Sequence, residues 1–128
     1  MHDLTAAERR RVYECLARGA QACDRQLVEQ RWSWLMAAHV VGQHEVATHL
    51  HSHRQMLRLA RQTGDHREAA GQLVRIALLP IGHLLRRIPA GNVGRSTAGI
   101  TRRMEPPEPV QVLIDWAVLG TRIPGTGW

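Results

Sequence analysis

Phenylalanine and lysine are absent from this sequence of 128 residues, and tyrosine occurs once. Because aromatic side chains favour β-strands, their scarcity argues against a β-sandwich. All 17 basic residues are arginine, a pattern that codon bias in a GC-rich genome produces. The formal net charge of +6 is therefore weak evidence for a nucleic-acid partner. Aromatic residues do not alternate with the arginines, as they do in single-strand binders, so nucleic acid ranks last among the partners considered.

Cysteines are also few, and long apolar runs are missing. Cys15 and Cys23 lie eight residues apart, which on one helix separates them by about 12 Å, too far for a disulfide. Two unpaired thiols suit a reducing compartment. The N-terminal stretch MHDLTAAERR is charged and lacks the apolar core of a signal peptide, and no apolar run approaches the ~20 residues of a membrane span. We expect a cytoplasmic protein without a membrane partner.

The residues that are abundant favour helices. Ala, Leu, Arg, Gln and Glu dominate the first ninety residues, and a hydrophobic content of 44% is enough to form a core. We expect an all-α bundle of four to five helices arranged as antiparallel helical hairpins. It should form a single domain at 1–120, with a long Gly/Pro loop at 88–109 before the last helix and a loose tail at 121–128. The helices that apolar spacing predicts are 3–30, 31–41, 44–62, a fourth from Asp65 or His66 to Leu85, and 110–120.

Local signals predict where these helices begin and end. Thr5 followed by Glu8 predicts a capping box. Gly42 predicts a break, and the turn residues around Gly64 predict the end of the third helix. Pro80 should kink or split the fourth helix. The residues of that helix that should face the core are Ala70, Leu73, Val74, Ala77, Leu78, Ile81 and Leu85.

Five of the eight histidines lie in HVVGQHEVATHLHSH, residues 39–53. A zinc-protease helix needs His-Glu-x-x-His, because four residues return the second imidazole to the same helix face. Here Thr48 occupies the required place, and His49 follows His44 by five residues, about 140° around the helix. The sequence therefore does not carry this protease motif.

The helical periodicity of residues 44–62 sorts the histidines by face. His49 and His53 lie on the apolar face, whereas His44 and His51 lie opposite and should face solvent. The other members of that apolar face are Val46, Leu50, Leu57 and Ala60. On the preceding helix His39 belongs to the inward side, and Gln43 follows one turn later. That inward side is formed by Trp32, Leu35, Met36 and Val40.

A chain reversal at Gly42 would bring His39 opposite His49 and His53. Three imidazoles that converge inside a bundle, two of them from a His-x-x-x-His pair, suit Zn, Fe or Cu. The sequence thus predicts a transition-metal site with these three ligands. A helix that continued through Gly42 would place His39 and His53 ~21 Å apart and would exclude the site.

The alternative is that the same histidines are neutral core groups. In that case they would be hydrogen-bonded to neighbours such as Gln43 or Gln72, as buried polar groups usually are. Glu45 lies on another side of its helix, so no carboxylate joins the set, and no base or nucleophile stands out. His83 should line the loop or face solvent.

The Gly/Pro loop contains a second candidate site. Gly91, Asn92 and Gly94 tolerate positive φ angles, so their amides could form an anion-binding nest with Arg95. The spacing and the lysine of a P-loop are missing. A purely structural loop would use the same residue types, and both interpretations stay open.

Two short stretches, GQHEVA at 42–47 and GDHREA at 64–69, resemble the turns of tetratricopeptide-type helical hairpins. They are 22 residues apart, whereas that repeat needs about 34. We interpret the likeness as shared helix–turn–helix chemistry. It favours, as an alternative function, a non-enzymatic module that binds another protein or a second copy of this chain.

Four motifs together resemble a known family. They are W-x2-L-x2-AH-x3-Q from Trp32 to Gln43, H-x3-H-x2-M from His49 to Met56, GQ-x2-R from Gly71 to Arg75, and P-x-GN-x-G from Pro89 to Gly94. The pattern, over about residues 30–107, is similar to a family of small bacterial helical proteins of unknown function, some encoded near heavy-metal-responsive genes. The resemblance implies no known activity. It does group Gln43, Gln72 and Arg75 with the three histidines, as residues that would support the ligands.

Our first hypothesis is therefore a cytoplasmic metal-binding protein that acts in metal handling or resistance. Its ligands would be His39, His49 and His53, and whether it is an enzyme stays open. The second hypothesis is the interaction module with structural histidines.

Overall fold

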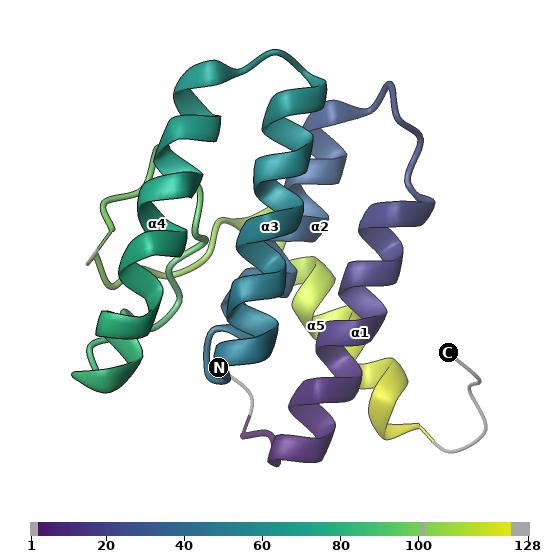
Figure 1. Cartoon of the computed structure of the whole chain (residues 1–128). Coiled ribbons are helices and arrows are strands. Elements are labelled where there is room, and N and C mark those ends of the chain that lie inside the picture. The colour runs from purple at the N-terminus through teal and green to yellow at the C-terminus, as the bar shows by residue number, and fades with distance from the viewer. Residues whose placement is uncertain (1–2, 101, 124–128) are drawn as a thin grey trace.

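A computed structural model describes residues 3–100 and 102–123 of the chain. This part of the molecule contains five helices and no strands, which confirms the all-α class. Figure 1 shows α1 to α4 running alternately up and down, with α5 behind α1 and α2. The five helices are α1 (Ala6–Ala22), α2 (Val28–Gly42), α3 (Val46–Gln62), α4 (His66–Leu84) and α5 (Glu108–Arg122).

α2 is the central helix of the bundle. It packs against α1, α3 and α5, whereas α4 packs on α3 alone among the described helices. One group of buried side chains joins α1, α2 and α5 and includes Val12, Leu16 and Ile114. A second group joins α2 to α3 around Trp32 and Met56. The inner face of α3 is therefore enclosed by α2 on one side and by α4 on the other.

The first helix begins as predicted and ends earlier. Thr5 and Glu8 form the predicted capping box, in which each side chain accepts a hydrogen bond from the other residue's backbone amide. The prediction of one helix over 3–30 is wrong, because α1 ends at Ala22 and α2 begins at Val28. The Asp24 carboxylate accepts a hydrogen bond from the Gln26 amide. Such a side chain offers the backbone an alternative to helical hydrogen bonds and favours a turn.

The chain reverses direction after Gly42, as predicted, and α3 begins at Val46. A Cβ atom on Gly42 would lie 2.7 Å from the ring of Tyr13, so only glycine lets α1 pack this closely. The Thr48 hydroxyl donates to the Gly42 carbonyl oxygen and ties the first turn of α3 to the end of α2. This reversal is the condition that brings the two helices with histidines face to face.

α4 is continuous from His66 to Leu84, so Pro80 does not split it. The Asp65 side chain caps its start by accepting from the Glu68 amide. Pro80 lacks an N–H group and leaves the Ile76 carbonyl without its helical donor. Because Pro80 lies on the exposed side of the helix, water can hydrate that carbonyl.

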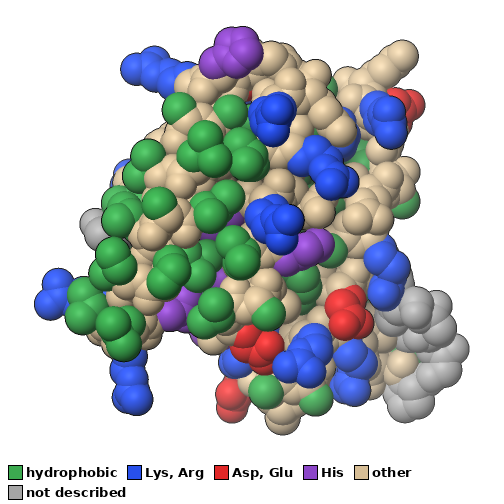
Figure 2. Space-filling view, viewed as in Figure 1, with side chains coloured by type: hydrophobic (Ala, Val, Ile, Leu, Met, Phe, Trp, Pro, Cys, Tyr) green, Lys and Arg blue, Asp and Glu red, His purple; other side chains and the backbone are tan. Residues whose placement is uncertain are grey.

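The predicted core face of α4 is wrong. The buried residues of this helix are instead Glu68, Gln72 and Leu79. Because α4 is an edge helix that packs only on α3, its apolar side has no helix to cover it, and Figure 2 shows apolar side chains gathered there. All seven predicted core residues are exposed, namely Ala70, Leu73, Val74, Ala77, Leu78, Ile81 and Leu85.

The described parts of the loop between α4 and α5, residues 85–100 and 102–107, have no regular structure and are held in place by Asn92. The Asn92 side chain is buried, its amide donates to the carbonyls of Gly99 and Arg102, and its oxygen accepts from the Gly94 amide. The loop is thus anchored at its middle, where it passes against His39 of α2 and Gln72 of α4.

The last helix extends to Arg122, so Thr121 and Arg122 belong to α5 and not to the loose tail predicted at 121–128. Residues 124–128 lie outside the described part of the chain. Cys15 and Cys23 are free thiols, as expected. Within the described residues, none of the helices combines the length and the apolar character that a membrane crossing requires.

Candidate metal centre

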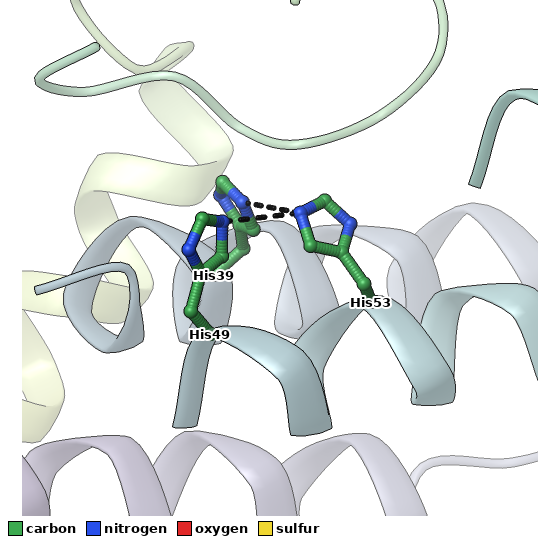
Figure 3. Close-up of side chains that lie close together, drawn as sticks. All are labelled: His39, His49 and His53. Atoms are coloured by element: carbon green, nitrogen blue, oxygen red, sulfur yellow. Dashed lines mark hydrogen bonds between the residues drawn. The ribbon is translucent and has the colours of Figure 1, made fainter. Parts of the chain in front are cut away.

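Three imidazoles meet inside the bundle. His39 comes from α2, and His49 and His53 come from successive turns of α3. All three are buried, and one nitrogen of each ring lies within 4.8 Å of the others. Figure 3 shows the three rings turned toward one another across the gap between the two helices. The structure therefore brings together the three histidines that the sequence predicts as metal ligands.

The nitrogens that face one another are the Nε2 atoms. His53 Nε2 lies 3.2 Å from His39 Nε2 and 3.1 Å from His49 Nε2. A tetrahedral zinc ion with Zn–N bonds of about 2.0–2.1 Å separates neighbouring ligand nitrogens by roughly 3.3 Å. These two separations are close to that value, and the ligand nitrogens of His39 and His49 lie within 4.8 Å of each other.

The outer nitrogens of two of these rings are fixed as donors. His39 Nδ1 donates to the carbonyl oxygen of Asn92 over 2.8 Å, and a carbonyl oxygen can only accept. His53 Nδ1 donates to Gln72 Oε1 over 2.7 Å. The Gln72 amide cannot be reversed, because its Nε2 donates to the Gly94 carbonyl and to the Glu68 carboxylate. In the neutral rings, Nε2 of His39 and of His53 must therefore carry a lone pair.

The third ring has a partner that the sequence analysis missed. His49 Nδ1 lies 2.8 Å from His83 Nε2, so His83 of α4 reaches the centre. The prediction that His83 lines the loop or solvent is wrong, because it took the side of Val74 and Leu78 as the core face of the helix, and both of these residues are exposed. On the continuous helix His83 follows buried Leu79 by one turn and Gln72 by three. The helical spacing of the polar residues Glu68, Gln72, Arg75 and His83 was the signal that could have revealed this face.

Burial keeps the three imidazoles neutral. It lowers the pKa of His39, His49 and His53 below the ordinary value of 6.5, and repulsion from neighbouring imidazolium or guanidinium charges adds to the effect. The pKa of His49 falls to about 3. At neutral pH the rings are therefore in the form that binds metal, and no proton must leave before a metal enters.

A buried carboxylate connects the loop to α4 beside the histidines. Glu68 accepts hydrogen bonds from Arg95 Nε over 3.1 Å and from the Ser96 amide over 2.8 Å. The Arg95 guanidinium also lies over the Trp32 ring, 4.4 Å from its centre. Through Gln72, Glu68 fixes the orientation of His53. These polar groups support the centre without being ligands themselves.

The predicted anion nest is therefore engaged with groups of the protein itself. Arg95 binds the Glu68 carboxylate, and the Gly94 amide donates to Asn92. Gly91 and Gly94 do adopt positive φ angles, of 72° and 81°. An external anion at this loop stays a prediction.

Gly94 has a direct role beside the histidine centre. A Cβ atom at this position would lie 2.5 Å from the His39 ring. The absence of a side chain lets the loop backbone pass against the imidazole. The Asn92 carbonyl oxygen can therefore accept the hydrogen bond that His39 Nδ1 donates. The conformational freedom of glycine and its small size are both needed here.

Gln43 and Arg75, the other two residues grouped with the ligands by sequence, also lie at the centre. Arg75 donates to the carbonyls of Gly71, Arg95 and Ala98 and fastens the loop to α4. Gln43 is fully buried, and its Nε2 has no hydrogen-bond partner among the described residues. A buried donor without a partner costs about 1–3 kcal/mol.

The remaining histidines stand apart from the centre. His44 and His51 are exposed, as predicted, and His51 contacts the Tyr13 hydroxyl. His66 is exposed at the start of α4, and His2 lies outside the described residues. Glu45 forms an ion pair with Arg10 on the surface. On α3, His49 and His53 thus face the core and His51 faces solvent, as their spacing predicts, whereas His44 lies in the turn before α3 and not on the helix predicted to begin there.

Comparison with known proteins gives one match. The sequence model of DUF3703, a family of proteins of unknown function, matches residues 6–114. No curated protein and no solved structure matches the chain. The match extends from the start of α1 into the first half of α5 and includes all the residues of the histidine centre. It confirms the resemblance to an uncharacterised family of helical proteins.

Proposed function

This chain belongs to the DUF3703 family, whose function is unknown, and we propose from its buried histidines that it is a metal-binding protein. The observation that carries the proposal is the pair of Nε2 atoms of His39 and His53. They lie 3.2 Å apart in the interior, and both rings have their Nδ1 proton committed to an oxygen acceptor.

The protein groups of this arrangement cannot satisfy all of its hydrogen bonds among themselves. His49 can supply one proton, from its Nε2 to the lone pair of His53. The lone pair of His39 then still faces an acceptor, because no ring has a second proton to give. Protonating a ring would supply it, but burial lowers the pKa of each histidine. A metal ion at the common point of the three Nε2 atoms satisfies all three lone pairs at once.

The donor set narrows the choice of metal. Three neutral imidazoles favour Zn, Fe or Cu over Mg or Ca, which prefer oxygen ligands. The buried group consists of histidines alone, with no cysteine or carboxylate among its members. The Nδ1 atoms of the three rings are hydrogen-bonded to a backbone carbonyl, a glutamine and a histidine. Metal-binding imidazoles in proteins usually have such hydrogen-bond partners at their second nitrogen. The free thiols of Cys15 and Cys23 support a reducing, cytoplasmic setting, where such a site would serve metal handling or resistance.

The test is the metal content of the purified, untagged chain. Elemental analysis should find near-stoichiometric transition metal in the wild type and its loss in a His49→Ala/His53→Ala variant. His44→Ala is the matched control, since this exposed histidine lies near the start of the same helix and should leave the metal content unchanged. Circular dichroism establishes that each variant is folded.

The opposite result points to the second hypothesis. If the folded wild type takes up no Zn, Fe or Cu after reconstitution at neutral pH, the histidines are structural. The exposed apolar side of α4 would then favour an interaction module. Metal in the double variant at the wild-type level would show that the ion binds elsewhere.

A further inference from the structure

A cavity of about 210 Å³ opens beside the three histidines and is also lined by Gln43 and by residues of α4 and the loop. We propose that it binds a small organic anion, whose carboxylate takes the fourth coordination position of the metal and accepts a hydrogen bond from Gln43. The apolar part of this ligand would lie between α4 and the loop. The inference rests on the proposed metal site and adds the class of molecule that the site receives.

The first argument is the buried amide of Gln43. Its Nε2 has no partner among the described residues, although Gln43 is 1% exposed. Gln43 lies one turn after His39 on α2 and shares the cavity with all three ligands. An N–H group can only donate, so the missing partner must be an acceptor. An oxygen bound to the metal at its open position would be such an acceptor.

The second argument is charge. Three neutral imidazoles leave a divalent ion with its full charge, and zinc sites with three protein ligands keep the fourth position for water or substrate. Arg75 and Arg87 also line the cavity, and no acidic side chain does so among the described residues. A cation would find no counter-charge in this cavity. An anion would find the metal, two guanidinium groups and the Gln43 donor.

The third argument is the apolar wall. The cavity opens at residues that the fold leaves partly exposed, because Leu78, Ile81 and Ile100 are 43%, 53% and 40% exposed. In Figure 2 histidine side chains are visible between the apolar side chains on this face of the molecule. An inorganic anion would leave this wall in contact with water, whereas a short hydrocarbon chain would cover it. The apolar side chains that form the wall are Leu78, Leu79, Ile81, Ile88, Pro89 and Ile100.

The size of the cavity limits the ligand. Sites for drug-sized molecules have volumes of about 300–1,000 Å³, and this cavity is smaller. A monocarboxylate with roughly six carbons suits the space, with its head at the metal and its tail against Ile81 and Ile100. The charge argument and the apolar wall together exclude both a bare oxyanion and an organic cation as the preferred ligand.

The experiment uses the full chain loaded with Co²⁺, whose visible spectrum reports directly on its ligands. Hexanoate, acetate and hexylammonium are titrated separately. We expect hexanoate to change the spectrum in a saturable manner with at least tenfold higher affinity than acetate, which has the same head and no tail. Hexylammonium, which has the same tail and the opposite charge, should leave the spectrum unchanged.

Two variants assign the binding to this cavity. Gln43→Leu should keep the Co²⁺ stoichiometry and weaken hexanoate about tenfold, the loss expected when one hydrogen bond to a charged group is removed. Gln111→Leu on the surface of α5 is the matched control and should change nothing. Should Gln43→Leu fail to fold, Ile81→Ser tests the wall instead, because this residue is exposed. It should weaken hexanoate and leave acetate unaffected.

The possible outcomes separate the two proposals. A chain that binds no Co²⁺ overturns the metal site itself. A chain that binds Co²⁺ and shows no response to hexanoate, or binds acetate equally well, retains the metal site and overturns the organic-anion ligand. Unchanged hexanoate affinity in both Gln43→Leu and Ile81→Ser also overturns it.

Discussion

His39 Nε2 and His53 Nε2 lie 3.2 Å apart, and neither ring has a proton to place between them. His39 is oriented by the loop, through the Asn92 carbonyl. His53 is oriented by α4, through the Gln72 amide. The orientation of the two rings thus depends on segments that are distant in sequence from both of them, and the centre forms only when α2, α3, α4 and the loop have all assembled.

The first prediction concerns Gln72, which accepts a hydrogen bond from His53 Nδ1 and so determines which nitrogen of that ring carries the proton. Replacing it by methionine, Gln72→Met, removes the acceptor of the His53 Nδ1 proton and keeps a side chain of similar length. We expect the metal affinity to fall about 10- to 100-fold, the usual effect of losing such a partner. Competition with a chromophoric chelator measures this affinity. Gln111→Leu is the control, and an equal affinity in Gln72→Met and the wild type would contradict the role of Gln72.

A second prediction follows from the contact of His49 with His83. The His83→Ala variant leaves His49 Nδ1 without its partner, and the expected loss of metal affinity is about tenfold. This is at the lower end of the range, because His83 is only half-buried and water can replace it. His66→Ala, at the exposed start of the same helix, should bind metal as the wild type does. If His83→Ala instead lost the bound metal completely, we would conclude that His83 is itself a fourth ligand.

Parts of the centre that depend on local sequence could be predicted. The pair His49 and His53 is a consequence of the four-residue helical spacing, and the reversal after Gly42 follows from the residue type. Once these two features are fixed, His39 must face the pair. The exposure of His51 follows from the same periodicity.

The face of α4 could not be predicted in this way. Its apolar residues indicate a core face, but burial depends on which neighbours the helix has, and α4 has only α3 and the loop. The buried side is the polar one, since Glu68 and Gln72 find partners in the loop and in the histidines. Hydrogen bonds between distant segments thus decided the orientation, and hydrophobic periodicity contains no information about them. His83 was misplaced for the same reason.

The third prediction is the pH dependence of the metal-free protein. The pKa values of the buried histidines are lowered on folding, so the unfolded chain binds more protons than the folded chain below the ordinary pKa of 6.5. Their contribution to stability is complete above pH 6.5 and is lost as the pH falls toward the lowered values, about 3 for His49. The slope is up to about 1.4 kcal/mol per pH unit for each histidine.

Urea unfolding at a series of pH values measures this loss directly. The His49→Ala/His53→Ala variant has two fewer such groups, and its stability should fall less steeply between pH 6.5 and pH 4. Saturating zinc should raise the stability of the wild type at pH 7 and have progressively less effect as the pH falls, because protons compete for the same nitrogens. Parallel pH curves for the wild type and the double variant would contradict the assignment.

The last prediction uses two glycines with similar backbone angles. Gly64 has φ of 70° and Gly94 has φ of 81°, so alanine is strained at either position, at a cost of about 1–2 kcal/mol. A Cβ atom at Gly64 meets nothing within 4 Å, whereas one at Gly94 lies 2.5 Å from the His39 ring.

Gly64→Ala should therefore be destabilised only by the backbone strain and should keep its metal affinity. Gly94→Ala should be destabilised further, and because the loop must withdraw from His39, it should also bind metal more weakly. Urea unfolding and chelator competition on the two variants separate backbone strain from the contact with the ligand. Equal effects of the two substitutions would show that the loop does not orient His39.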